Sequence, residues 1–76
     1  MNVAVHFYNE ENKKKIRRYE NNIAQWNKRI GHIDHLIIYR QHNNIGFAEL
    51  VREKEHLEKE IKRAEMQIKK LKRQTF

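Results

Sequence analysis

The chain has 76 residues, of which 38% are hydrophobic and 36% are charged, and its net charge is +7. A chain of this length forms one small domain, and the absence of cysteine excludes disulfides and thiolate metal sites. Its longest apolar run, residues 36–39, is far shorter than the roughly 20 residues that a membrane span needs. Serine and a glycine-rich phosphate loop are also absent, so we expect no enzyme, no cofactor and no small-molecule substrate. The composition predicts a soluble, cytoplasmic binding protein.

Residues 1–8 are predicted to form an N-terminal arm outside the helical domain. Val3, Val5 and Phe7 alternate with other side chains, which is typical of a strand, but the chain offers no second strand to pair with. The segment lacks the basic leader and the long apolar region of a signal peptide. The arm therefore either frays or becomes ordered on a partner.

Residues 9–76 are predicted to form a helical hairpin. Asn9 followed by Glu10 and Glu11 is a helix start, because Asn caps free amides and acids complement the positive end of the helix dipole. We expect the first helix over residues 9–41, a turn over 42–46 and the second helix over 47–73. The turn contains two Asn residues, which tolerate a left-handed backbone conformation, and Gly46, which prefers it.

Two apolar heptad runs support the hairpin, because each has core residues at alternating spacings of three and four. When the chain folds back, the facing residues have numbers that sum to 87. The first run is Ile16, Tyr19, Ile23, Trp26, Ile30, Ile33 and Ile37, and the second is Leu50, Lys54, Leu57, Ile61, Ala64, Ile68 and Leu71. This set of fourteen residues is called the seam below. It predicts an all-α, two-helix antiparallel coiled coil.

One continuous helix in a parallel dimer is the alternative, but the turn segment breaks the heptad phase between Ile37 and Phe47. Within the hairpin, Lys54 is the one charged seam residue, and we expect its stem to cover Ile33 and its ammonium group to lie beside Asp34. Exposed ion pairs are also expected between Arg29 and Glu60 and between Glu20 and Lys72.

The positive charge is concentrated where the two ends of the hairpin meet. Residues 20–65 contain eight Lys or Arg and eight Asp or Glu, so the whole excess lies in residues 1–19 and 66–76. Cations near a helix N-terminus are disfavoured by the helix dipole, and a polyanion would relieve this repulsion. The basic open end is therefore the predicted nucleic-acid or anion-binding site. Its residues are Lys13, Lys14, Lys15, Arg17, Arg18, Lys69, Lys70, Lys72 and Arg73.

Near the turn, apolar residues also occur outside the seam, so the tip is hydrophobic on more than one face and is predicted to be covered by another surface. A second hairpin would complete a homodimeric four-helix bundle. The predicted interface is Leu36, Ile38, Tyr39, Ile45, Phe47, Ala48 and Val51.

Five histidines raise the question of a metal site, and His32 and His35 share one outer face of the first helix. A third ligand, from His56 or Glu49, would need the second helix to present its outer face, which the heptad phase opposes. We therefore predict no metal site.

The sequence thus favours a small regulatory or accessory protein whose basic open end contacts nucleic acid or a nucleoprotein complex. The alternative is an adaptor or inhibitor that captures a target protein through the apolar tip, with the basic end steering it towards an acidic partner. A third hypothesis is a purely structural assembly element. The architecture alone resembles plasmid copy-control RNA-binding hairpin dimers and some ribosomal hairpin proteins; no motif is shared, so no residue role transfers.

Overall fold

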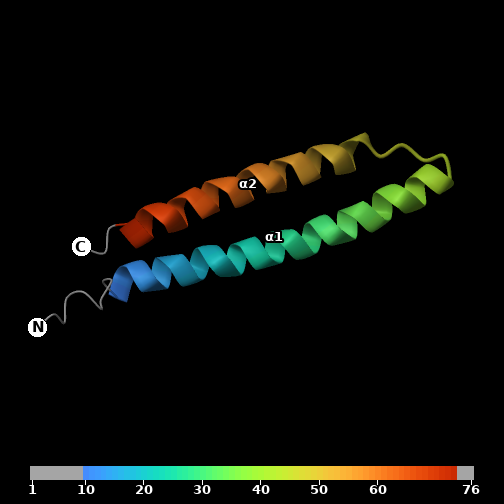
Figure 1. Ribbon diagram of the computed structural model, residues 1–76. Coiled ribbons are helices and arrows are strands. Elements are labelled where there is room, and N and C mark those ends of the chain that lie inside the picture. Colours follow the sequence, from blue (N-terminus) through green and yellow to red (C-terminus); the bar gives the residue numbers. More distant parts are fainter. Residues whose placement is uncertain (1–9, 74–76) are drawn as a thin grey trace, which may run out of the picture.

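The structure is a computed structural model, and it describes residues 10–73. Within that range the chain forms two helices and no strand, α1 over Glu10–His42 and α2 over Ala48–Arg73. Figure 1 shows the helices lying side by side in opposite directions, with the turn at one extremity and the start of α1 beside the end of α2 at the other. The all-α antiparallel hairpin is therefore confirmed. The predicted N-terminal arm lies outside the described residues.

The seam lies between the two helices. All fourteen of its residues are buried or half-buried, whereas most other positions on both helices are exposed. Ile33 is completely buried, and Ile16, Leu50 and Ala64 retain at most 8% of their exposed surface. The remaining seam residues are half-buried, because each helix of a two-helix hairpin is covered on one side only.

The first helix ends in a Schellman motif, in which the last amides fold back on the final helical carbonyls. The amide of Ile45 donates to the carbonyl of Arg40 at 2.8 Å, and the amide of Asn44 donates to that of Gln41 at 3.3 Å. Asn44 has a φ of 54°, so it supplies the left-handed conformation that this motif requires. We expected Gly46 to favour that conformation, but its φ is not positive.

The predicted helix limits therefore need correction at the turn. His42, placed in the turn by the sequence, is the last residue of α1, because the motif closes one residue later than expected. Phe47, placed in the second helix, precedes α2 instead. Its carbonyl accepts from the amides of Leu50 and Val51 at 3.1 and 3.2 Å, which makes Phe47 the N-cap residue.

Three ion pairs join the two helices and follow their register. Lys54 Nζ lies 2.7 Å from Asp34 Oδ1, as predicted. The other two pairs join Arg29 to Glu53 and Arg40 to Glu49, and the three pairs have residue numbers summing to 88, 82 and 89. These sums lie around the predicted value of 87.

The partner predicted for Arg29 was wrong. Arg29 donates to both carboxylate oxygens of Glu53, at 2.7 and 3.0 Å, and not to Glu60. Glu60 instead lies 3.3 Å from Arg63, three residues later on its own helix. Within the described residues, Glu20 and Lys72 also form no ion pair.

Gly31 lies in the interior of α1, where glycine is about 0.5–1 kcal/mol less favourable than alanine. A Cβ atom at this position would meet nothing within 4 Å. Neither a close approach to α2 nor a positive φ requires a glycine here. The hairpin by itself therefore offers no steric reason for Gly31.

Candidate nucleic-acid interface at the open end

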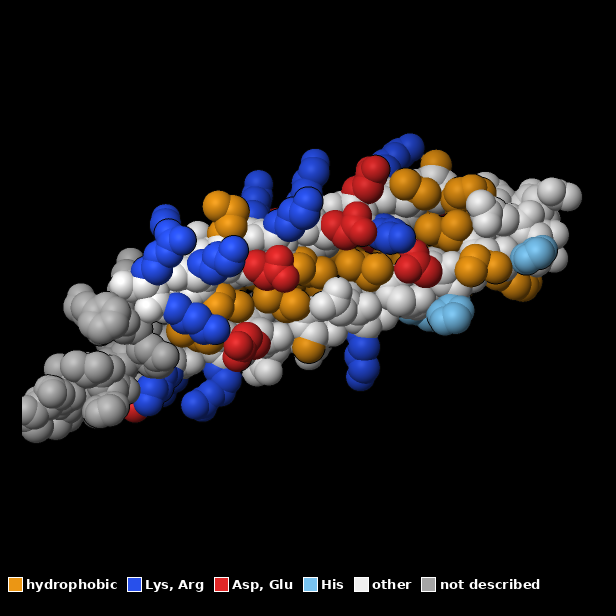
Figure 2. Space-filling view, viewed as in Figure 1, with side chains coloured by type: hydrophobic (Ala, Val, Ile, Leu, Met, Phe, Trp, Pro, Cys, Tyr) orange, Lys and Arg blue, Asp and Glu red, His pale blue; other side chains and the backbone are white. Residues whose placement is uncertain are grey.

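The basic open end combines the first turns of α1 with the last turns of α2. Eight of its nine predicted residues are exposed, and Lys13 is half-buried. Figure 2 shows Lys and Arg side chains gathered towards this extremity, whereas acidic side chains mix with them along the middle of the hairpin. The fold thus brings together two basic segments that are about 50 residues apart in the sequence.

Most cations of the open end lack an ionic partner. Lys13 lies 3.8 Å from Glu10, one turn earlier on α1. Within residues 10–73, the other eight form no hydrogen bond and no ion pair; they are Lys14, Lys15, Arg17, Arg18, Lys69, Lys70, Lys72 and Arg73. Their charges repel one another, and phosphate groups would neutralise them.

A shallow groove joins the two helices at this end. Lys15, Arg18 and Tyr19 of α1 line it together with Gln67 and Leu71 of α2. The half-buried Tyr19 and Leu71 form its apolar floor, and the cations lie at its edge. The groove therefore presents positive charge from one helix directly beside the other.

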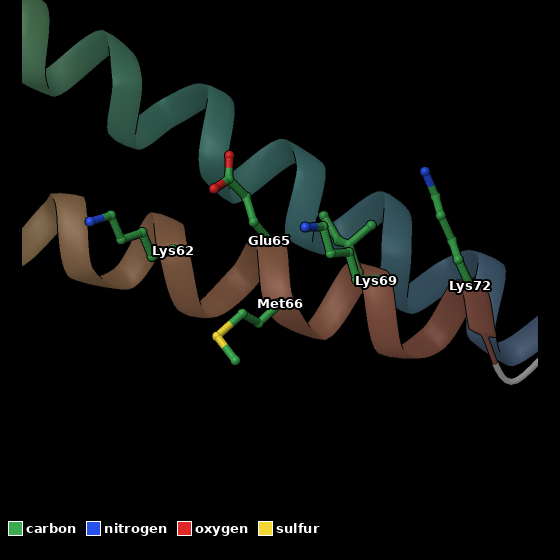
Figure 3. Close-up of a pocket in the computed structure, with 6 residues that line it drawn as sticks. Lys62, Glu65, Met66, Lys69 and Lys72 are labelled. Atoms are coloured by element: carbon green, nitrogen blue, oxygen red, sulfur yellow. The ribbon is translucent and has the colours of Figure 1, made fainter.

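A second depression lies along α2 alone, and Figure 3 shows its lining. Lys62, Lys69 and Lys72 surround it together with Glu65, Met66 and Ile68. In this view Met66 projects to the opposite side of the α2 ribbon from Glu65 and Lys72, and it is 66% exposed. The exposed Met66 was not identified from the sequence, because it falls outside both apolar heptad runs.

In the half of the hairpin nearest the turn, unlike the open end, most of the cations are paired with carboxylates across the helices. The hydrogen bonds from Arg29 lower the pKa of Glu53 and raise that of Arg29 itself. The hydrogen bond to Asp34 likewise raises the pKa of Lys54. We call residues 29–57 the tip half. Its charges stabilise one another and leave few cations for an external anion.

Arg40 holds the turn against α2 and was not singled out from the sequence. Its Nη1 donates to the carbonyl of Gly46 at 3.1 Å and to Glu49 Oε1 at 2.8 Å. The spacing of nine residues across a turn gave no periodic signal, so only the folded turn reveals the contact. Asn43 adds a side-chain hydrogen bond to the carbonyl of Tyr39 at 2.8 Å.

The predicted apolar interface surrounds this turn. Ile38, Tyr39 and Ile45 are 54%, 59% and 45% exposed, and Ala48 is also exposed. Leu36, Phe47 and Val51 are half-buried. Three of the four large hydrophobic side chains that are most exposed in the described range thus lie at the tip.

In the part of the chain that the structure describes, no group of three or more His, Asp or Glu side chains is arranged to hold a metal ion. Neither α1 nor α2 combines the length and the apolar character that crossing a membrane requires.

Comparisons with known proteins add no assignment: no protein-family model matches the chain, and neither a curated protein nor a solved structure shows significant similarity to it.

Proposed function

We propose that this protein is a small, non-enzymatic regulatory or accessory protein that binds nucleic acid, or a nucleoprotein complex, through its basic open end. The observation that carries the proposal is the set of eight open-end cations without ionic partners in residues 10–73, next to a tip half in which three of the four Lys and Arg side chains are paired with carboxylates. Self-repulsion of this kind is relieved when phosphates are neutralised and counterions are released.

The proposed recognition depends on backbone charge and shape. Tyr19 and Trp26 belong to the seam and are half-buried, so they are not available as an aromatic platform for bases. Neither base stacking nor a helix inserted into a nucleic-acid groove is proposed to read the bases. Lysine and arginine contacts to phosphate then give affinity with little sequence preference.

Binding to mixed-sequence duplex DNA and RNA, followed by fluorescence anisotropy over a range of salt concentrations, tests the proposal. Replacing Lys14, Arg17 and Lys70 with Gln should weaken binding about tenfold or more and reduce the salt slope by about 2–3. The matched control replaces three exposed cations away from the open end, Lys28, Arg52 and Lys59, and changes the net charge equally.

The control variant should lose less than about threefold in affinity, since it leaves the open end intact. Circular dichroism verifies that both variants keep their helices. Equal losses in the two variants, or no binding by the intact protein at low salt, would contradict the proposal.

We further propose that the protein is a homodimer in which a second copy covers the apolar tip and completes a four-helix bundle. The exposure of Ile38, Tyr39 and Ile45 supports this, because a surface of this kind is stabilised when it is buried. Replacing the exposed Ile38 and Tyr39 with Ser should then lower the mass measured by light scattering from that of a dimer to that of a monomer.

The same exposed side chains support a second candidate function, an adaptor that captures a target protein through the tip. Affinity capture from a host lysate distinguishes the adaptor from the homodimer. The intact chain and a variant carrying both Tyr39→Ser and Ile45→Ser serve as parallel baits. A protein retained by the intact chain and lost with the substituted bait, together with a monomeric mass for the purified chain, would favour the adaptor.

A further inference from the structure

We propose that two hairpins associate antiparallel with a two-fold axis beside Gly31, offset so that residues 20–42 of the two α1 helices overlap. The resulting dimer carries one basic open end at each extremity. Because the two ends point away from each other, the dimer bridges two nucleic-acid segments instead of binding one. The bridging rests on the proposed nucleic-acid binding, whereas the dimer geometry rests only on the proposed homodimer.

The proposed contact face lies on α1, next to the seam. Ala24, Gly31 and Ile38 are seven residues apart, so they lie on one side of the helix, about 100° around it from the seam residues that precede them. All three are exposed, and Ile38 retains 54% of its accessible surface. α2 does not cover this face.

An antiparallel contact centred on Gly31 brings together residues whose numbers sum to 62. Ala24 of one copy then meets Ile38 of the second copy, so that a small residue accommodates a large one, and the two Gly31 residues meet on the axis. The absence of any atom within 4 Å of a Cβ built at Gly31 leaves room for the second helix. The glycine that the hairpin alone does not explain thus allows close approach of two helices.

α2 extends the contact face on the same side of the hairpin. Asn27 and Glu58 line one groove between the helices. Ile38 lies three turns after Asn27, and Val51 lies two turns before Glu58, so both fall on this side. Val51 is half-buried and joins Ile38 in an apolar surface drawn from both helices. Two hairpins packed through such surfaces give the four helices of a bundle.

The charge distribution favours a second copy of the chain as the partner on this face, with its α1 offset so that the axis lies at Gly31. Gly31 is the midpoint between Glu20, where the electrically neutral segment begins, and His42, the end of α1. Overlap across this segment buries the neutral part of both copies and leaves the open ends beyond the overlap, with Arg17 at its edge opposite Ile45 of the second copy. The open ends then lie about 50 Å apart, several times the Debye length, whereas a parallel dimer would place them together.

The area needed for a stable dimer also favours the staggered contact over a contact between the tips. The exposed parts of Ile38, Tyr39 and Ile45 amount to roughly 300 Å², against about 800 Å² per partner in a stable interface. A contact from Glu20 to His42 runs for about 33 Å along α1 and supplies the additional area.

Single-cysteine variants test the axis directly, because the chain has no cysteine of its own. Under mild oxidation, Gly31→Cys should form a disulfide-linked dimer, whereas Ile45→Cys at the tip and Gln25→Cys on an exposed outer position should not. Crosslinking through Ile45→Cys in place of Gly31→Cys would overturn the proposal in favour of a tip-to-tip dimer. A monomeric mass for the intact protein in sedimentation equilibrium would overturn it altogether.

A charge substitution provides a second test that leaves the helix intact. Gly31→Glu places two carboxylates together on the axis and should weaken dimerisation by about tenfold or more, since the charges are close and partly removed from water. Gln25→Glu is the matched control, with the same added charge at an exposed position, and should change the dimer dissociation constant by less than about twofold. Equal effects of the two substitutions would contradict the proposed axis.

Bridging is measured by energy transfer between donor-labelled and acceptor-labelled duplexes mixed with the protein. The intact protein should give transfer, and Gly31→Glu should lose it while each duplex still binds in a salt-dependent manner. If Gly31→Cys crosslinks but no duplex is bound, the dimer geometry stands and the proposed nucleic-acid function fails. If duplexes bind without transfer, bridging fails and the proposed function stands.

Discussion

The open end and the tip half share one seam but differ in how their charges are satisfied. In the tip half, Lys54, Arg29 and Arg40 each pair with a carboxylate on the other helix. At the open end, eight cations have no ionic partner within the described residues. Packing therefore holds both regions together, while the surface charges give the two regions different capacities for binding.

Packing along the seam and the pairing of surface charges therefore depend on different residues of the sequence. Ile16 and Ala64 towards the open end are as well covered as Leu50 near the turn, with between 3% and 8% exposure. The unpaired cations thus lie on a packed scaffold and do not reflect a loose end of the structure. A polyanion that binds there would find the cations already arranged on two neighbouring helices.

The largest expected effect is the loss of packing at the fully buried Ile33. Ile33→Ala removes buried methyl groups and should cost about 2–4 kcal/mol in the free energy of unfolding, measured in urea. Leu71→Ala, at a half-buried seam position of the open end, should cost less than half as much. Equal losses in the free energy of unfolding for Ile33→Ala and Leu71→Ala would show that the tip half and the open end contribute equally to stability.

A smaller effect is expected at the turn, where Asn44 adopts a left-handed conformation with φ of 54°. Asn44→Val should destabilise the hairpin by about 1–2 kcal/mol, because a branched side chain is strained there. Asn44→Gly should be neutral or slightly stabilising. Gly46→Ala is the matched control, since Gly46 has no positive φ and its Cβ would meet nothing within 4 Å.

Thermal unfolding of these three variants gives the measurement. Loss of stability in Gly46→Ala, with Asn44→Val unchanged, would contradict the assignment of Asn44 as the left-handed residue. It would also restore Gly46 to the role expected from the sequence.

The smallest effect should come from the ion pairs of the tip half, as a dependence of stability on pH. The pKa of Glu53 is lowered in the folded chain, so its contribution is present above the ordinary carboxyl range near pH 4–5 and is lost as pH falls through the lowered pKa. The pKa of Lys54 is raised, so its contribution is present below about pH 10 and is lost as pH rises through the raised pKa.

Glu53→Gln should therefore reduce the loss of stability on the acid side and leave the alkaline side unchanged. Urea unfolding at several pH values, with Glu55→Gln as the exposed control on the same helix, measures the effect. If the free energy of unfolding falls equally at acid pH in the intact protein and in Glu53→Gln, the pairing with Arg29 adds nothing to stability.

The sequence determined the helical hairpin, its register and the location of the positive charge. Heptad spacing requires one apolar side on each helix, and two such sides of equal length satisfy each other by folding back at the Asn-rich segment. The pairing of Lys54 with Asp34 followed from the same register. These features are local or periodic, so composition and spacing are enough to predict them.

Tertiary structure alone decided which long side chains meet and which residue turns the chain. The sequence offered both Glu53 and Glu60 to Arg29 across the seam; in the folded chain Arg29 pairs with Glu53, while Glu60 pairs with Arg63. Asn44, and not Gly46, adopted the left-handed conformation because closure of α1 depends on several hydrogen bonds formed at once. Alternative ion-pair partners and alternative turn residues differ little in local energy. Only the contacts of the folded hairpin distinguish them.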